Sequence, residues 1–447
     1  MIELSGKRVV VVGLGASGIA AARLCVRRGA HVTATDAKPA SSLNDEVRSL
    51  ADEGVMLVLG GHDEAGLLSA DVVVVSPGVP PLPEFDLAER RGVVVIGEVE
   101  LAVRALRYPA PVVALGGTNG KSTTTCLVGA MLERQGLTTF TGGNLGEPLA
   151  NHADERFDVI VLEVSSFQLE RVKTFQPKVA VVLNVTDDHL DRYPNFDAYA
   201  HAKGNAFALQ GPEDTAVVPA HDPVCEREAR RGSARIVSFG PGGTVSVEDD
   251  AIVDTRSGDR FLRRNIALRG GHNALNVAAA IAAARELGAL PRAITEVLAS
   301  FRGLPHRMAH VADVGGVRYY DDSKGTNVGA SVTALFGLEE PRAVLIAGGR
   351  DKGGSYEPLA DALRARGRAA VLIGEAARSI AAAIGDAVPT RHAASMREAV
   401  RLSASLARAG DAVLLSPACS SFDMFRDYKD RGDAFVVEVR ALEDLPS

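Results

Sequence analysis

The sequence predicts an α/β protein of three domains, each built on a mostly parallel open β-sheet. Two observations support this fold class: strand-like apolar runs alternate with helical stretches along the whole chain, and glycine-rich turns follow several of these runs. A chain of 447 residues has room for about two to four domains. We expect the domains to span residues 1–99, 100–303 and 304–447.

The first domain is predicted to be Rossmann-like. An apolar strand at residues 7–12 leads into the turn Gly13-Leu-Gly-Ala-Ser-Gly18, an alanine-rich helix that ends near Gly29, and a second strand at residues 31–35. Further strands are expected at residues 72–76 and 93–96. This succession is a βαβ unit extended into a small parallel sheet.

The second domain begins with an apolar strand at residues 111–115 and a helix at residues 121–135. Strands at residues 159–162 and 179–183 continue the α/β pattern. Residues 235–269 differ, because their alternation and glycine-rich turns predict a small sheet of short antiparallel strands. The alanine-rich helix at residues 272–286 follows, and Gly288 marks its end.

The third domain repeats a strand followed by a glycine-bearing loop. The repeats lie at residues 344–349, 371–374 and 413–416. This rhythm is typical of another open, doubly wound, Rossmann-like sheet.

Composition excludes several classes of protein. Apolar residues make up 46% of the chain and charged residues 23%, which is ordinary for a folded soluble protein. No apolar run approaches the roughly 18 residues that span a bilayer, and the acidic N-terminus is unlike a signal peptide, so we expect a cytoplasmic protein with no membrane insertion. The net charge is −7 without a Lys/Arg cluster, which argues against a nucleic-acid partner. The four cysteines are far apart and form no CxxC pair, which argues against a zinc site or a disulfide framework.

The most informative motif is the loop Gly116-Gly-Thr-Asn-Gly-Lys-Ser122, which follows a strand and opens a helix. In that context the backbone N–H groups and the helix dipole face phosphate oxygens, Lys121 neutralises the β- and γ-phosphates, and Ser122 binds Mg²⁺. Leu115 occupies the position where the usual pattern has glycine, so this is a shorter variant of the loop. The alternative is a tight structural turn. The loop residues expected to bind ATP are Gly117, Thr118, Asn119, Gly120, Lys121, Ser122 and Thr123.

Two candidate metal ligands follow strands of the same domain. Glu163 ends one apolar strand, and His189 lies a few residues after another. In open α/β sheets ligands bind at the carboxyl ends of strands. A carboxylate is a natural Mg²⁺ ligand and an imidazole an unusual one, so either residue could instead be a satisfied polar residue at a strand end.

The first-domain glycines also fit a dinucleotide fingerprint. Gly13-x-Gly15-x-x-Gly18 is followed at a distance by Asp36, as in NAD-binding folds. The physical content of the motif is a tight turn that places a pyrophosphate on a helix N-terminus, and any nucleotide diphosphate satisfies it. A nicotinamide oxidoreductase therefore remains an alternative, but it leaves the loop at residues 116–122 unexplained.

Together these blocks resemble the Mur ligase family of bacterial cell-wall synthesis. The blocks at residues 303–307, 321–327 and 415–423 resemble the branch of the family that adds D-glutamate. The matching blocks run through all three domains and comprise Gly13 to Gly18, Ser76-Pro-Gly78, Gly116 to Ser122, Gly142-Gly-Asn-Leu-Gly146, Glu163-Val-Ser-Ser-Phe-Gln-Leu169, Asn184-Val-Thr-Asp-Asp-His-Leu-Asp-Arg-Tyr193, Gly303-Leu-Pro-His-Arg307, Asp321-Asp-Ser-Lys-Gly-Thr-Asn327 and Leu415-Ser-Pro-Ala-Cys-Ser-Ser-Phe-Asp423.

The resemblance implies an ATP-dependent ligase that joins D-glutamate to the L-alanyl carboxylate of UDP-N-acetylmuramoyl-L-alanine through an acyl phosphate. It implies ATP and two Mg²⁺ ions, and it favours a monomer. Two other interpretations remain open: a ligase of the same family that adds another amino acid, and a non-catalytic sensor or scaffold that binds UDP-muropeptides.

The resemblance also implies roles for individual residues. Lys121, Glu163, His189 and Lys203 are expected in catalysis, with Ser122, Glu163, His189 and a carbamylated Lys203 binding metal. Without the resemblance, Lys203 would be interpreted as a surface lysine. Further ATP contacts are expected from Asn273, His306, Arg307, Asp322 and Lys324. The UDP-substrate is expected to contact Ala16, Ser17, Asp36, Gly78 and Asn144. D-Glutamate is expected to contact His189, Thr326, Lys352, Ser421 and Phe422.

Overall fold

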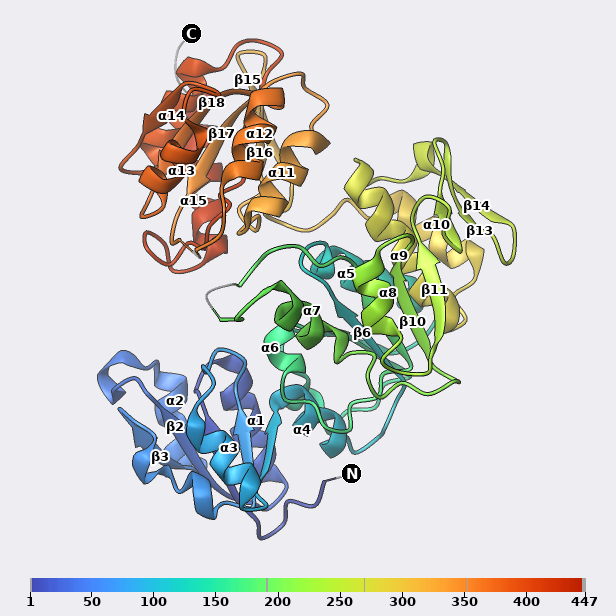
Figure 1. The fold of residues 1–447 in the computed structure, drawn as a ribbon, viewed down its shortest axis with the longest axis vertical. Helices are drawn as coiled ribbons and strands as arrows, with labels where there is room; N and C mark the ends of the chain where they lie inside the picture. Colours follow the sequence, from blue (N-terminus) through green and yellow to red (C-terminus); the bar gives the residue numbers. More distant parts are fainter. Residues whose placement is uncertain (1, 190–191, 269, 352, 444–447) are drawn as a thin grey trace. The chain divides into compact units, whose positions relative to one another are not determined.

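The computed structural model describes residues 2–189, 192–268, 270–351 and 353–443 (Figure 1). The chain divides into two compact units. One comprises Met1–Val185, Asp197–Ile266 and Leu275–Ser300, and the other comprises Thr186–Phe196, Ala267–Ala274 and Phe301–Ser447. Within the described residues the strands form three sheets, two in the first unit and one in the second. The prediction of a three-domain α/β protein with mostly parallel sheets is confirmed.

The first sheet has the order β3-β2-β1-β4-β5, and all its strand pairs are parallel. Side chains alternate along β1, so Val9 and Val11 pack on the face covered by α1, whereas Val10 and Val12 pack on the other face with Phe85 of α3. The all-valine strand β4 is likewise buried on both faces, as expected for a central parallel strand. The elements are β1 (Arg8–Val12), α1 (Ala16–Arg27), β2 (His31–Asp36), α2 (Asp45–Asp52), β3 (Met56–Leu59), β4 (Val72–Val75), α3 (Pro83–Arg90) and β5 (Val94–Gly97).

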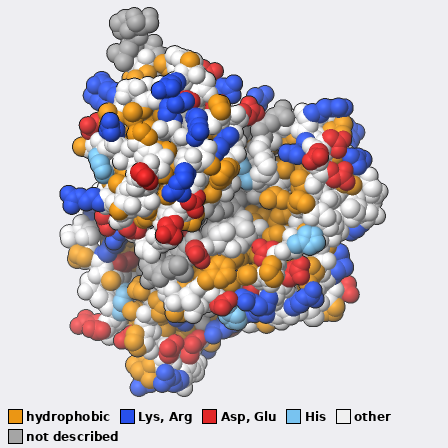
Figure 2. Space-filling view, turned by 45° about the horizontal axis from the view of Figure 1, so that its top comes forward, with side chains coloured by type: hydrophobic (Ala, Val, Ile, Leu, Met, Phe, Trp, Pro, Cys, Tyr) orange, Lys and Arg blue, Asp and Glu red, His pale blue; other side chains and the backbone are white. Residues whose placement is uncertain are grey.

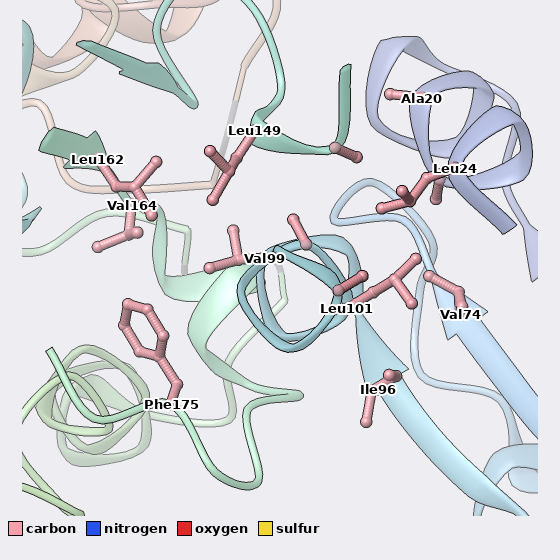
Figure 3. Close-up of a cluster of buried hydrophobic side chains, with 14 of the residues drawn as sticks. Ala20, Leu24, Val74, Ile96, Val99, Leu101, Leu149, Leu162, Val164 and Phe175 are labelled. Carbon is pink, nitrogen blue, oxygen red and sulfur yellow. The ribbon is translucent and has the colours of Figure 1, made fainter. Parts of the chain in front are cut away.

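Helix α4 (Glu98–Ala105) packs against both sheets of the first unit. In Figure 3, Leu101 points toward Leu24 of α1 and Val74 of β4, which belong to the first sheet and its helices. Val99 points toward Leu149, which lies in the part of the chain that forms the second sheet. The apolar residues of α4 therefore join two cores into one cluster. This shared burial explains why both sheets fall in one compact unit.

The second sheet has the order β14-β13-β12-β11-β10-β9-β6-β8-β7. Its elements are β6 (Val112–Gly116), α5 (Lys121–Arg134), β7 (Thr139–Gly143), β8 (Val159–Glu163), α6 (Ser166–Leu169), β9 (Val179–Val182), α7 (Phe196–Gly204), β10 (Thr215–Pro219), α8 (Pro223–Ala229), β11 (Arg235–Phe239), β12 (Val245–Val247), β13 (Ala251–Asp254), β14 (Asp259–Leu262), α9 (Gly271–Glu286) and α10 (Pro291–Ser300).

One expectation for this sheet is wrong in part. Residues 235–269 were expected to form only antiparallel strands, but β11 pairs in parallel with β10 and with β12, and the antiparallel pairs are β12 with β13 and β13 with β14. The reason is the helix α8 between β10 and β11, which provides the crossover that a parallel pair requires. Strands β12, β13 and β14 form the antiparallel edge.

The third sheet has the order β15-β16-β20-β17-β18-β19, with β15 antiparallel to β16 and the other pairs parallel. Leu345 of β17 packs with Leu363 of α12, and Val344 packs on the opposite face with Phe435 of α15, so helices cover both faces. The elements are β15 (Ala309–Val314), β16 (Val317–Asp321), α11 (Val328–Gly337), β17 (Ala343–Gly348), α12 (Glu357–Arg366), β18 (Gly367–Ile373), α13 (Ala377–Ile384), β19 (Thr390–His392), α14 (Met396–Leu406), β20 (Ala412–Leu415) and α15 (Tyr428–Glu443).

The strand order brings three loops to one edge of the third sheet. Because β20 lies between β16 and β17 in parallel, the segments that begin at residues 322, 349 and 416 all leave the sheet at neighbouring carboxyl ends. This is the edge where open α/β sheets bind ligands.

The distribution of charged side chains and the character of the helices can be compared with the expectations from composition. On the face drawn in Figure 2, basic and acidic side chains are interspersed. Among the helices in the described part of the chain, none combines the length and apolar character needed to cross a membrane.

Candidate functional site

The loop between β6 and α5 has the backbone of a phosphate-binding turn. Gly117 and Gly120 have φ angles of +132° and +85°, a region that favours glycine. A Cβ atom on Gly120 would lie 2.3 Å from the side-chain oxygen of Asn276, so a larger residue would require the Asn276 side chain to move. The loop leads directly into α5, and the first backbone N–H groups of a helix are suited to binding an anion.

Asn184 binds this loop from the neighbouring strand. Its carbonyl oxygen accepts the N–H of Thr118 at 2.9 Å, and its side-chain amide both accepts from the N–H of Asn119 at 2.9 Å and donates to the Asn119 carbonyl at 3.1 Å. The sequence analysis quoted Asn184 within a motif but assigned it no role. Its position just after β9, the strand beside β6, was the signal that could have identified it.

Two lysines meet on one carbonyl of the loop. Lys121 Nζ donates to the Gly117 carbonyl at 3.0 Å and to the Thr118 carbonyl at 2.7 Å, and Lys203 Nζ donates to the Gly117 carbonyl at 2.7 Å. Lys203 is only 3% exposed, and its ammonium lies 4.4 Å from the ring centroid of Tyr199. The interpretation of Lys203 as a surface lysine is therefore wrong. Burying this side chain costs free energy unless it is satisfied, and here it is satisfied by the phosphate loop.

Glu163 lies beside the start of the same loop. It ends β8 in register with Leu115 of β6 and is 2% exposed. Its Oε1 accepts a hydrogen bond from Asn144 Nδ2 at 2.7 Å, whereas its Oε2 is buried and, within the described structure, has no hydrogen-bond partner. Asn144 was expected to contact the UDP-substrate, and the structure places its amide against Glu163.

These residues fit a magnesium ion bound together with phosphate. A buried carboxylate oxygen without a partner is suited to a cation, and Ser122 adds a buried hydroxyl in the first turn of α5. Across the described ranges no group of three or more His, Cys, Asp or Glu side chains is arranged to hold a metal. Mg²⁺ at nucleotide sites usually takes part of its coordination from phosphate oxygens.

The glycine turn of the first sheet is tightly packed. A Cβ atom on Gly18 would lie 1.8 Å from the Gly13 carbonyl oxygen, and Ser76 Oγ donates to that same oxygen at 2.6 Å. Asp36 Oδ2 accepts the N–H of Leu14 at 2.8 Å, so this carboxylate stabilises the turn itself. Two further predicted UDP-substrate residues, Ala16 and Ser17, lie at the accessible start of α1, and Gly78 follows β4.

In the second unit, four of the residues expected to contact ATP lie close together. His306 Nδ1 lies 2.7 Å from Asp321 Oδ2, and the His306 carbonyl accepts the N–H of Lys324 at 3.1 Å. The Lys324 ammonium lies 3.8 Å from the ring centroid of Tyr428. Burial raises the pKa of Asp322 to about 7, opposed by the Ser416 hydroxyl and by the charge of Arg307. Asn273 lies in the first turn of α9.

A cavity of about 300 Å³ lies in the second unit. Among the residues expected to bind D-glutamate, His189 lines it, Thr326 directly precedes the lining residue Asn327, Ser421 is buried, and Phe422 is 65% exposed. Lys352 lies outside the described residues. The cavity is lined by Thr186, Asp187, Asp188, His189, Asn327, Val328, Gly329, Gly354, Ser355, Tyr356, Pro358 and Ala418.

Three protein-family models match successive regions of the chain. Residues 7–97 match the Mur ligase MurD-like N-terminal domain, residues 115–284 the Mur ligase middle domain, and residues 306–419 the Mur ligase glutamate ligase domain. The chain is 44% identical over 99% of both chains to the UDP-N-acetylmuramoylalanine--D-glutamate ligase of Geotalea daltonii. It is 47% identical, over 97% of both chains, to the ligase of the same name from Anaeromyxobacter dehalogenans.

Solved structures agree on the fold. The UDP-N-acetylmuramate-alanine ligase of Thermotoga maritima superposes with a TM-score of 0.60 at 19% identity, covering 97% of this chain and 99% of that one. The MurF ligase of Thermotoga maritima in complex with ADP gives a TM-score of 0.60 at 17% identity, covering 99% and 100%. At these identities the likeness concerns the fold.

Proposed function

This chain belongs to the Mur ligase family, and on that premise we propose that it uses ATP to join D-glutamate to the L-alanyl carboxylate of UDP-N-acetylmuramoyl-L-alanine in peptidoglycan precursor synthesis. The observation that carries this function is the full-length match to relatives bearing that name, at 42–47% identity over at least 97% of this chain. The two units described above contain the phosphate loop and the cavity beside His189 that such a reaction requires.

The reaction needs an activated carboxylate, because a free carboxylate is a poor electrophile. An oxygen of the L-alanyl carboxylate attacks the γ-phosphorus of ATP, and the bond to ADP breaks. The amine of D-glutamate then attacks the carbon of this acyl phosphate, phosphate leaves with the bonding electrons, and the nitrogen loses a proton. Both steps gain from groups that stabilise negative charge on phosphoryl and carbonyl oxygens.

The phosphate loop supplies most of these groups. We assign phosphate binding to the loop of residues 117–123, through backbone N–H groups other than those of Thr118 and Asn119, which donate to Asn184, and through the ammonium of Lys121. We assign Ser122, Glu163, His189 and Lys203 as magnesium ligands, the last as a carbamate. Two magnesium ions bound there would supply Lewis-acid stabilisation of phosphoryl charge. Lys203, buried against Gly117, positions the loop in either form.

The remaining assignments divide the substrates among three domains, residues 1–99, 100–303 and 304–447. The turn at Gly13–Gly18 presents a helix N-terminus to the UDP diphosphate. ATP is further contacted by Asn273, His306, Arg307, Asp322 and Lys324. The carboxyl edge of the third sheet binds D-glutamate. We further propose that the protein is a monomer. We also propose that it acts in the cytoplasm, because the reaction consumes ATP.

The test is phosphate release from ATP with purified protein, UDP-N-acetylmuramoyl-L-alanine and a panel of amino acids. Release that requires both the UDP-substrate and D-glutamate supports the proposal. Release that is equal with another amino acid would assign a different member of the family, and release independent of any amino acid would refute the ligase. Lys121→Ala serves as the control, since it should abolish release while the first domain still binds the UDP-substrate.

A further inference from the structure

We propose that Asn327 is a positioning residue that acts through Asp188 to set the place of His189 in the cavity of the second unit. The inference rests on the proposed function and on the expected contact of His189 with D-glutamate. All three side chains line the cavity, although Asn327 comes from the start of α11 and the other two from the loop after β9.

The amide of Asn327 has two separate tasks. Its Oδ1 accepts the backbone N–H of Ala330 at 2.8 Å and so caps the N-terminus of α11. Its Nδ2 donates to Asp188 Oδ2 at 3.1 Å. The two partners also determine which end of the amide is oxygen, because a backbone N–H requires an acceptor and a carboxylate requires a donor.

Asp188 transmits this contact to His189. Its other oxygen, Oδ1, accepts the backbone N–H of His189 at 3.0 Å, and its Oδ2 lies 3.7 Å from His189 Nε2. His189 has a φ of +57°, a left-handed conformation that side-chain-bearing residues rarely adopt. Its carbonyl accepts the N–H groups of Arg192 and Tyr193 at 3.0 Å. The Asp188 carboxylate therefore helps to stabilise a strained backbone at a candidate functional residue.

The pair is shielded from solvent, so its hydrogen bond is not weakened by water. The side chain of Asp188 is 8% exposed, and Asn327 is also 8% exposed. Two carboxylates in this place would repel each other, and two amides would present donor to donor unless one rotated. The site therefore requires one amide and one carboxylate, and it tolerates either order in principle.

This symmetry provides the test. Asn327→Asp keeps a helix-capping oxygen but places a second carboxylate beside Asp188, and we expect kcat/KM for D-glutamate to fall about tenfold or more while KM for ATP changes by less than about twofold. Asp188→Asn alone should also lower kcat/KM for D-glutamate. The exchanged pair, Asn327→Asp with Asp188→Asn, restores one donor and one acceptor and should recover to within about threefold of the wild type.

The matched control is Asn44→Asp. Asn44 caps α2 by accepting the N–H of Val47 at 3.1 Å, so the same substitution tests the loss of an amide cap elsewhere. It should leave kcat/KM for D-glutamate unchanged, and thermal unfolding should show that every variant is folded at the assay temperature. A merely structural role for Asn327 would lower stability without rescue by the exchanged pair.

The outcomes separate this inference from the function beneath it. If wild-type phosphate release does not depend on D-glutamate, the proposed function fails. If that dependence is present but Asn327→Asp leaves kcat/KM for D-glutamate unchanged, or if the exchanged pair is no better than the single variants, the positioning role is refuted.

Discussion

The Nζ atom of Lys203 donates a hydrogen bond at 2.7 Å to the carbonyl oxygen of Gly117, a residue 86 positions earlier in the chain. The contact joins α7 to the loop between β6 and α5, and Lys121 donates to the same carbonyl. A carbamylated lysine keeps one N–H group, so this hydrogen bond is compatible with both the amine and the carbamate.

Replacing Lys203 tests whether its charge or its modification matters. We expect Lys203→Met and Lys203→Arg each to lower kcat about 100-fold or more, because neither side chain can form a carbamate that binds metal. The measurement is phosphate release with saturating substrates, with thermal unfolding to confirm that each variant folds. A carbamate signal from ¹³C-bicarbonate should appear in the wild type and be absent from Lys203→Met. Near-normal turnover of Lys203→Arg would show that a cation is enough.

Glu163→Gln tests the buried carboxylate oxygen. The amide keeps the shape of the side chain and an oxygen for Asn144, but it removes the charge beside the phosphate loop. The concentration of Mg²⁺ that gives half-maximal phosphate release should rise about 10- to 100-fold. The comparison variant Asn144→Ala leaves the carboxylate in place and removes only its orienting donor, so its shift should be smaller. An unchanged Mg²⁺ requirement in Glu163→Gln would contradict the assignment of this residue as a ligand.

Gly18→Ala and Gly15→Ala form a matched pair in the first domain. The added methyl would lie 1.8 Å from the Gly13 carbonyl in the first variant, but nothing lies within 4 Å of it in the second. Gly15 also has an ordinary φ of −76°. We therefore expect Gly18→Ala to destabilise the protein and to raise KM for the UDP-substrate, and Gly15→Ala to be close to neutral in stability. Equal unfolding temperatures for the two variants would show that the turn relaxes around the methyl.

Glu98 predicts a pH dependence of stability. Burial raises the pKa of this carboxyl group at the start of α4 to about 7, although one oxygen accepts the N–H of Ala150 at 3.1 Å. In the unfolded chain its pKa is about 4.3. The folded protein therefore binds this proton more tightly, and the resulting stabilisation is fully present below about pH 4 and is lost as the pH rises through 7. The difference in unfolding temperature, Glu98→Gln minus wild type, should therefore be more positive at pH 8 than at pH 5. Parallel pH profiles for the two proteins would contradict the raised pKa.

Local patterns predicted the elements well and their pairing less well. Many strands of the three sheets were expected from apolar runs and glycine turns, since both are properties of neighbouring residues. Strands β3, β7, β10, β15, β16 and β19 were not predicted. The direction of β11 was missed because it depends on α8, a short helix whose crossover makes the pairing parallel. The grouping of two sheets in one unit was also missed, because it depends on where the two faces of α4 are buried.

The site residues were likewise predicted where they lie in one short stretch and missed where distant segments meet. The loop at residues 116–122 could be found from sequence because glycines, Lys121 and Ser122 carry their chemistry in a short stretch that a strand and a helix must flank. The contact of Asn184 with that loop, and that of Asn327 with Asp188, join segments far apart in the chain. Asn184 is marked only by its position after a strand, and no periodicity or spacing links Asn327 with Asp188.

The sequence by itself determined the α/β class, the phosphate loop and the family to which its motifs point. Only the tertiary structure decided that Lys203 is buried against Gly117, that Asn144 orients Glu163, and that Asn327 and Asp188 lie beside His189. The physical reason is that a motif specifies local backbone and charge, whereas burial and hydrogen bonding between distant side chains depend on which strands pack side by side.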